Sequence, residues 1–175
     1  MLKTAMDMIN DHAAAIDTFR DRGLQPVVAA AEIIIDAMCN SGFLYLCGNG
    51  GSAADCQHIA GEFVGRFRQE RPALPAIAFT TDTSILTCIG NDYRFEDIFA
   101  RQAEAMITDR DVLWVFSTSG TSKNILAAAD IAKKKGSKII AFVGRQDSPL
   151  ERIADVCVCA QCNLTSTSQE VHQLA

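Results

Sequence analysis

Five short apolar runs, separated by helix-like segments, constrain the fold of this chain more than any other feature. The runs cover residues 43–47, 76–80, 112–117, 138–144 and 155–160. Each is apolar along most of its length instead of alternating between apolar and polar residues, which is typical of strands buried on both faces. Because helix-like segments join the runs, we expect parallel pairing with helices on both sides of the sheet. The sequence therefore predicts an α/β fold, a three-layer sandwich with about five parallel strands.

Residues 1–40 precede these strands and are predicted to form two helices. The first has a narrow apolar seam whose members recur at steps of four and three: Leu2, Met6, Ile9, Ala13 and Ile16. Gly23 is expected to end this helix, and Pro26 to open a second helix that is apolar around much of its girth. The pair could bury its apolar surface against a partner subunit, or fold as a hairpin over the chain's own core. With the α/β core of residues 43–175, it is expected to form a single domain over residues 1–175.

Composition narrows the class of protein. The 175 residues carry a net charge of −5, with 49% hydrophobic and 21% charged residues, which argues against a general nucleic-acid or membrane-surface binder. No apolar run is as long as a membrane span, and the N-terminus lacks a signal peptide. Seven cysteines without disulfide-framework spacing indicate a reducing compartment, so we expect the cytoplasm. Cys157, Cys159 and Cys162 could be metal ligands, but core packing is favoured.

Two loops at the ends of predicted strands carry unusual chemistry. The glycine-rich segment 48–52 follows the first strand and opens a helix. Residues 117–122 follow the third strand and place five hydroxyls in six positions before another helix. Ligands of open parallel sheets sit at the carboxyl ends of strands, and a helix N-terminus attracts anions. Helix capping alone needs fewer hydroxyls, so the second loop predicts a site for a phosphate monoester.

The first loop also fits a dinucleotide-binding fingerprint. Gly48, Gly50 and Ala53 match G-x-G-x-x-A, and Asp82 could contact a ribose. Two helices precede the supposed first strand, however, and a dinucleotide site does not explain the second loop. A sugar phosphate uses both loops, one for the phosphate and one for the hydroxyl chain, so this ligand class is favoured.

The helix after the first loop carries a pair of chemically active side chains. His58 and Glu62 are four residues apart, so they share one face of the helix. Such a pair can bind zinc, or can hold a base beside its partner over a substrate. Near the C-terminus a further helix is expected, with Ser166 or Ser168 as its cap and His172 on its surface.

At this point four segments carry a family resemblance. Residues 47–67, 71–99, 116–125 and 169–172 together resemble the phosphoheptose isomerases of the sugar isomerase (SIS) domain superfamily. The resemblance implies a flavodoxin-like sheet and a homotetramer, for which we expect the N-terminal helices at the centre. It also implies conversion of sedoheptulose 7-phosphate to D-glycero-D-manno-heptose 7-phosphate, which feeds nucleotide-activated heptose for surface glycans such as lipopolysaccharide.

The resemblance also implies site residues. Glu62 matches the catalytic carboxylate, and His58, Glu62 and Gln169 match three of four zinc ligands. Asn91 and Asp92, which by themselves read as a turn, would reach the site, often across a subunit boundary. The substrate-binding set carried over is Asn49, Gly50, Gly51, Ser52, Glu62, Asn91, Asp92, Ser117, Thr118, Ser119, Ser122 and Gln169.

One departure from the family pattern concerns the C-terminus. The family's second catalytic group, a histidine, lies eight residues after the position of Gln169, which is two residues past Ala175. We therefore expect the fourth zinc ligand beyond residue 175 and a poorly ordered segment over residues 169–175. An alternative function is that of a non-enzymatic tetrameric SIS adapter, which binds the replication initiator protein. That branch lacks the carboxylate at the position of Glu62, so the presence of Glu62 favours the enzyme.

Overall fold

The computed structural model describes residues 1–162 and 164–175, and its centre is a parallel sheet of five strands in the order β2-β1-β3-β4-β5. The strands are β1 (Leu44–Gly48), β2 (Ala76–Ala78), β3 (Val112–Ser117), β4 (Lys138–Val143) and β5 (Val156–Cys159). Each coincides with one of the predicted apolar runs, and all neighbouring pairs are parallel. The order reverses between β1 and β3, which is where doubly wound sheets bind ligands.

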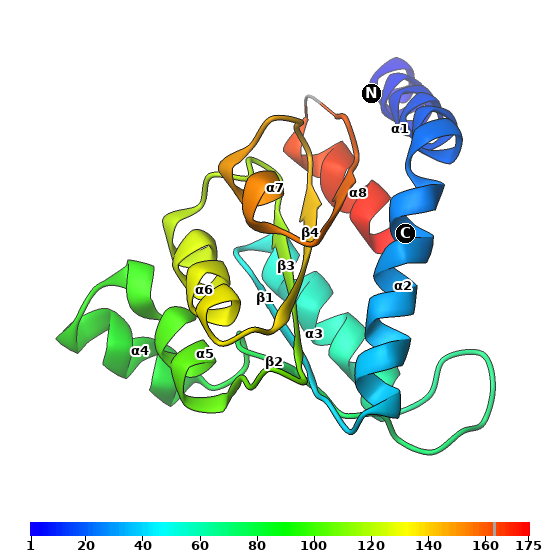
Figure 1. The fold of residues 1–175 in the computed structure, drawn as a ribbon. Coiled ribbons are helices and arrows are strands. Elements are labelled where there is room, and N and C mark those ends of the chain that lie inside the picture. The colour runs from blue at the N-terminus through cyan, green and yellow to red at the C-terminus, as the bar shows by residue number, and fades with distance from the viewer. Residues whose placement is uncertain (163) are drawn as a thin grey trace.

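Helices cover both faces of this sheet and complete the predicted three-layer sandwich (Figure 1). One face packs against α2 (Leu24–Cys39), α3 (Gly51–Val64) and α8 (Thr165–Leu174), with α1 (Leu2–Arg22) at its margin. The other face packs against α4 (Thr83–Asp92), α5 (Ala100–Met106), α6 (Lys123–Lys134) and α7 (Pro149–Ile153). A short 3₁₀ turn, Phe95–Asp97, links α4 to α5. The predicted α/β fold is therefore confirmed.

Along β1, β3, β4 and β5, alternate residues point into two separate apolar cores. Phe116 lies in the core beneath α2, α3 and α8, whereas its neighbour Val115 lies in the core beneath α5 and α6. Phe116 and Val115 are both almost completely buried. Burial of a side chain of this size contributes about 1.5–3 kcal/mol. This two-sided burial explains why the strands lack a polar alternation.

The N-terminal helices differ from their predicted arrangement where the two helices join. Helix α2 begins at Leu24, two residues before Pro26, because Gly23 both ends α1 and precedes α2 without a longer turn. Phe19 is the buried residue of α1. Most of the predicted seam is exposed within this chain, including Leu2, Met6 and Ile9. Helix α1 therefore does not fold back as a hairpin over the chain's own core.

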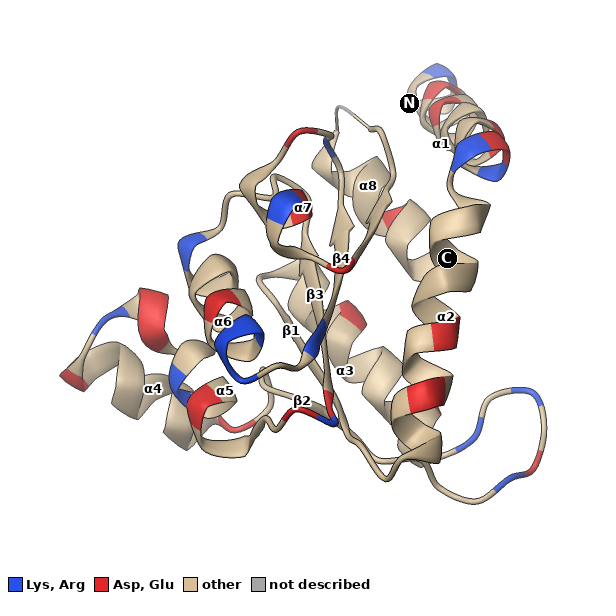
Figure 2. Cartoon of the chain, in the orientation of Figure 1, with Lys and Arg blue, Asp and Glu red and all other residues tan. Residues whose placement is uncertain are grey.

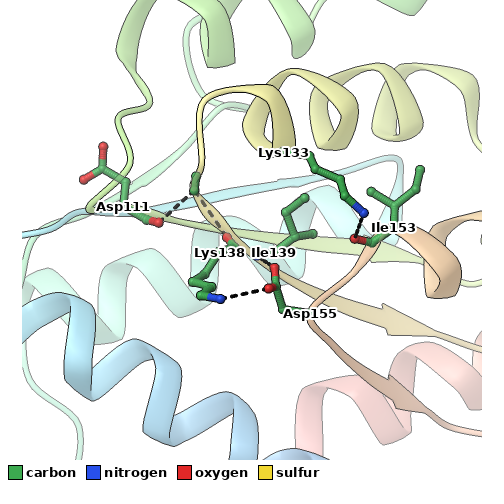
Figure 3. A network of polar contacts seen from close by, with 7 residues as sticks. Asp111, Lys133, Lys138, Ile139, Ile153 and Asp155 are labelled. Carbon is green, nitrogen blue, oxygen red and sulfur yellow. Dashed lines mark hydrogen bonds and ion pairs between the residues drawn. The ribbon is translucent and has the colours of Figure 1, made fainter.

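The amino-terminal edge of the sheet is held by polar contacts (Figure 3). The carboxylate of Asp155 accepts a hydrogen bond from the backbone N–H of Ile139 at 2.9 Å and pairs with Nζ of Lys138 at 3.0 Å. Asp111 Oδ1 accepts from the backbone N–H of Phe43 at 2.7 Å. These carboxylates fix the starts of β1, β4 and β5. The two loops with candidate binding residues lie at the opposite, carboxyl edge of the sheet.

Two further features of the fold are the state of the cysteines and the length and polarity of the helices. All seven cysteines are unpaired thiols. Cys157 and Cys159 pack against the core beneath α6, and burial raises the pKa of Cys157 to about 12. Cys162 is buried on the other side of the sheet. In the described part of the chain, no helix combines the length and apolar character that crossing a membrane requires.

Candidate active site

The hydroxyl-rich loop, residues 117–122, lies at the carboxyl end of β3 and leads into α6. Ser117 Oγ and Ser122 Oγ lie 3.1 Å apart and share a hydrogen bond. Ser122 occupies the N-cap position of α6, yet its side chain makes no capping hydrogen bond. The hydroxyl is therefore not used to cap the helix. This arrangement leaves the positive end of the α6 dipole facing the loop, where an anion is stabilised.

A glycine gives this loop its tight path. Gly120 has a φ of +65°, and a Cβ at this position would stand 2.3 Å from Cβ of Ser148. Only glycine fits both conditions. Ser119 Oγ accepts hydrogen bonds from the backbone N–H of Thr121 at 3.3 Å and from its hydroxyl at 3.1 Å. The loop is thus folded by its own hydroxyls.

A cavity of about 80 Å³ adjoins the hydroxyl-rich loop. Arg145 lies in its wall, two residues after the carboxyl end of β4. The guanidinium can therefore pair with an anionic ligand. The other lining residues are Thr118, Ser119, Cys162, Thr165 and Ser168.

The glycine-rich loop, residues 48–52, lies at the carboxyl end of the neighbouring strand β1. Gly50 has a φ of +57° and precedes α3, and Ser52 is buried in the first turn of that helix. Asn49 is joined to Asn124 in the first turn of α6 by two side-chain hydrogen bonds. The two loops are therefore connected. The sequence pattern did not indicate Asn124, although its place two residues after the hydroxyl-rich loop was a signal.

The predicted acid–base pair lies farther along α3. His58 Nε2 and Glu62 Oε1 are 3.8 Å apart, and both side chains are open to solvent, with exposed fractions of 59% and 36%. They line a cavity of about 440 Å³ between α3, the 65–75 loop and the last residues of α8. Arg71 of that loop donates to the backbone carbonyl of Glu62 at 2.7 Å and so anchors the end of the helix. Figure 2 shows the cluster of basic residues on this loop.

Asp55 lies on the same face of α3, one turn before His58, and was not singled out from the sequence. Its side chain is buried, and its Oδ2 atom has no hydrogen-bond partner among the described residues. Burial raises the pKa of the Asp55 carboxyl, and the nearby His58 charge partly opposes this effect. The three-residue spacing from His58 was the available signal, since such spacing places two side chains on one helical face.

The described residues supply only part of the predicted zinc site. His58 and Glu62 are side chains of the kind that zinc binds. The Gln169 amide instead lies against Gly51, at the start of α3, about 10 Å along the helix from His58. Within the described residues, no three His, Cys, Asp or Glu side chains are grouped to hold a metal ion. Gln169 is not one of these four residue types, so the ligand set of His58, Glu62 and Gln169 stays a prediction.

Comparison with known proteins identifies the family to which this chain belongs. A family model described as the SIS domain matches residues 8–144, which include both loops and all of α3. The chain belongs to the SIS domain family. Among curated relatives of this SIS domain protein, the phosphoheptose isomerase of Geotalea daltonii is 44% identical over 172 residues, which cover 98% of this chain and 90% of the relative. The phosphoheptose isomerase of a Roseiflexus species is 46% identical over 168 residues, covering 94% and 85%.

Solved structures give the same result for the SIS domain fold. The phosphoheptose isomerase of Neisseria gonorrhoeae superposes with a TM-score of 0.94 at 36% identity, covering 99% of this chain and 92% of the other. That of Francisella tularensis superposes with a TM-score of 0.95 at 32% identity, with the same coverage. Within the SIS domain family, the chain therefore belongs to the phosphoheptose isomerases.

Two further residues that the family resemblance predicts for the site lie apart from the rest. Asn91 and Asp92, whose sequence alone resembles a turn, form the last turn of α4. Both are exposed, and Asn91 Nδ2 donates to Asp92 Oδ1 at 2.8 Å. Because α4 covers the opposite face of the sheet from α3, one chain does not bring them to Glu62. Asp82 caps α4 by accepting from the N–H of Ile85 at 2.9 Å, which disfavours the dinucleotide interpretation.

The C-terminal helix of the chain differs from three expectations. Helix α8 begins at Thr165, with Leu164 rather than Ser166 or Ser168 at the cap position. His172 was expected on the surface but is buried, and its Nε2 donates to the backbone carbonyl of Val143 at 3.0 Å. Val171 is also buried. Because these two residues anchor the helix on the sheet, it is regular to Leu174 instead of poorly ordered over residues 169–175.

Proposed function

We propose that this protein converts sedoheptulose 7-phosphate to D-glycero-D-manno-heptose 7-phosphate, the isomerisation that precedes nucleotide-activated heptose for surface glycans. The observation that carries the proposal is Glu62, a partly exposed carboxylate beside His58 at the wall of a cavity of about 440 Å³. The family supports it, since its curated relatives are named phosphoheptose isomerases.

Ketose–aldose isomerisation needs one base that can move a proton between neighbouring carbons. Glu62 takes the proton from C1 of the ketose while the C2 carbonyl oxygen gains a proton from a donor, which gives an enediol across C1 and C2. Glu62 then returns its proton to C2 as the O1 hydroxyl gives up its own proton, which leaves the aldehyde at C1. The carbonyl oxygen gains negative charge in this step and needs a donor. His58, whose Nε2 lies 3.8 Å from Glu62 Oε1, is a described side chain that can donate there.

The two loops at the carboxyl edge of the sheet bind the rest of the substrate. The phosphate accepts hydrogen bonds from Ser117, Thr118, Ser119 and Ser122 at the N-terminus of α6, where the helix dipole favours negative charge. The sugar hydroxyls contact the glycine-rich loop through Asn49, Gly50, Gly51 and Ser52. Arg145, in the wall of the adjoining cavity, adds a positive charge for the phosphate dianion.

Zinc belongs to the proposal as a cofactor, with His58 and Glu62 as its ligands in this chain. Bound zinc supplies positive charge near a developing oxygen anion, and none of the steps above depends on it. Equilibrium dialysis of the parent protein and His58→Ala against zinc tests the ligand assignment. We expect roughly one zinc per chain in the parent and weaker binding in the variant. Equal binding by both proteins would remove His58 from the site.

We further propose a homotetramer in the cytoplasm, with sites shared between copies. Glu62 lies about 16 Å along α3 from Gly51, whereas the hydroxyl-rich loop stays at the carboxyl edge of the sheet. A neighbouring copy can complete such a site, and Asn91 and Asp92 are exposed for this purpose. The uncovered seam of α1 provides apolar surface for assembly. Seven unpaired cysteines suit a reducing compartment.

The adapter alternative is less well supported. A scaffold that only binds the replication initiator has no use for a general base, yet Glu62 is present and faces a cavity. The named relatives reported above are isomerases. Absence of turnover in the assay below, together with binding of the initiator, would favour the adapter.

An NMR assay of sedoheptulose 7-phosphate turnover, with and without added zinc, tests the function. Glu62→Gln keeps the size of the side chain but removes the base, so we expect turnover to fall by at least about a hundredfold while the protein stays folded. Glu70→Gln is the matched control, because Glu70 is 86% exposed and contacts Arg66. Near-parental turnover in Glu62→Gln would remove Glu62 from the mechanism.

A further inference from the structure

The side chains of Asn49 and Asn124 form a closed pair of amide hydrogen bonds between the two substrate loops. Asn49 Nδ2 donates to Asn124 Oδ1 at 2.9 Å, and Asn124 Nδ2 donates to Asn49 Oδ1 at 2.8 Å. Asn124 is 3% exposed, whereas Asn49 is only partly buried. One partner is thus locked in the protein interior, and the other can contact a ligand.

A third hydrogen bond fixes the orientation of both amides. Asn124 Oδ1 also accepts from the backbone N–H of Ile125 at 3.0 Å. That N–H can only donate, so the atom of Asn124 beside it must be the oxygen. Asn49 must then turn its NH₂ group toward this oxygen. The backbone of α6 therefore dictates which way the Asn49 amide points.

The geometry points to Asn124 as a positioning residue for the isomerase reaction, an inference that rests on the proposed function. Asn49 uses one N–H and one carbonyl lone pair on Asn124, so it presents its remaining N–H and lone pair in a fixed direction. A hydroxyl of the sugar chain can donate to one and accept from the other. Because Asn124 is the second residue after the phosphate loop, it also sets the spacing between the phosphate and this contact. Asn124 thus aligns the sugar chain of a bound ketose phosphate without touching it.

A double-mutant cycle distinguishes this role from a purely structural one. We would measure kcat and KM with sedoheptulose 7-phosphate for Asn49→Ala, Asn124→Ala and the double variant. Each single change should lower kcat/KM by about tenfold to a hundredfold, the scale expected when a substrate is misaligned. If Asn124 acts through Asn49, the double variant should lie within about twofold of Asn49→Ala. If the losses of kcat/KM in the two single variants multiplied in the double variant, the inference would be overturned.

Inhibition by inorganic phosphate supplies the second readout. It reports the hydroxyl-rich loop alone, so its inhibition constant should stay within about twofold of the parent value in Asn124→Ala. A larger rise would show that the change disrupts the start of α6, and would overturn the positioning role. If Asn124→Ala does not fold, Asn124→Asp replaces it. The aspartate keeps the acceptor for Ile125 and removes the donor to Asn49, although it adds a negative charge, so the lack of additivity with Asn49→Ala is the readout to use for this variant.

Gln102→Ala is the matched control for loss of a buried amide. Gln102 is 5% exposed, and its Nε2 donates to the backbone carbonyls of Phe79 and Ile98 at 3.0 and 2.8 Å. We expect it to lower the melting temperature with little change in kcat/KM. A loss of kcat/KM equal to that of Asn124→Ala would assign both effects to stability and overturn the inference. An inactive parent protein would instead overturn the proposed function, on which the inference rests.

Discussion

The side-chain amide of Gln169 lies directly against the Cα of Gly51. A Cβ atom on residue 51 would stand 2.6 Å from Oε1 and 2.7 Å from Nε2 of Gln169. This contact joins α8 to the start of α3, beside the glycine-rich loop. Any side chain at residue 51 would therefore occupy the place of the Gln169 amide.

Gly51→Ala should displace Gln169 without unfolding the protein. The clash involves the far end of a flexible side chain, and alanine is a better helix former than glycine. We expect an equal or higher melting temperature, with turnover reduced to the level of Gln169→Ala. Gly61→Ala is the control, since a Cβ at Gly61 meets no other atom within 4 Å. Parental turnover in Gly51→Ala would show that the position of Gln169 does not matter to the reaction.

Ser122→Ala should weaken phosphate binding more than it weakens the fold. Ser122 makes no capping hydrogen bond, so the loss of stability should be below the about 1 kcal/mol of a working cap. KM should rise on the order of tenfold, because a hydroxyl that binds a dianion is lost. Ser148→Ala provides the opposite case, since Ser148 Oγ caps α7 by accepting from the N–H of Glu151 at 3.2 Å. That variant should lose stability and keep its KM. If instead Ser148→Ala raised KM and Ser122→Ala mainly lowered stability, the assignment of Ser122 to phosphate binding would be contradicted.

His172 should make the protein less stable in mild acid. Burial lowers the pKa of His172, and its hydrogen bond to Val143 opposes this only in part. Since its pKa is lower in the folded state, the neutral form contributes stability above the unfolded pKa of about 6.5, and this is lost as pH falls through the folded value. Between pH 7 and pH 5, the free energy of unfolding should fall more steeply in the parent than in His172→Gln. Parallel curves for the parent and His172→Gln would refute this role.

Assembly should depend on the apolar seam of α1. Ile9 is 68% exposed in the single chain, so a charge there is harmless to the monomer and costly at an interface. We expect a tetramer for the parent by light scattering at micromolar concentration, and smaller species for Ile9→Glu. Asn10→Glu, on the same helix but off the seam, should remain tetrameric. A monomeric parent protein would contradict the proposed assembly.

The parts of the fold that were predictable from the sequence are those set by local pattern. Continuous apolar runs such as residues 112–117 mark strands because burial on both faces leaves no room for polar alternation. The two loops were predictable because their ligand chemistry is concentrated in adjacent residues. Asn124 and Asp55 were not, since their roles depend on partners brought close by the fold. The burial of His172 depends on how α8 rotates against the sheet, and two turns of sequence do not fix that rotation.

The two edge strands give the sheet a protective property. Strand β2 has three residues and β5 has four, whereas β3 and β4 have six each. An approaching chain that paired with either edge would therefore gain only a few backbone hydrogen bonds. Short edge strands of this kind resist edge-to-edge aggregation, even in a chain that is 49% hydrophobic. Growth of the sheet into a fibre by strand pairing at either edge is therefore disfavoured.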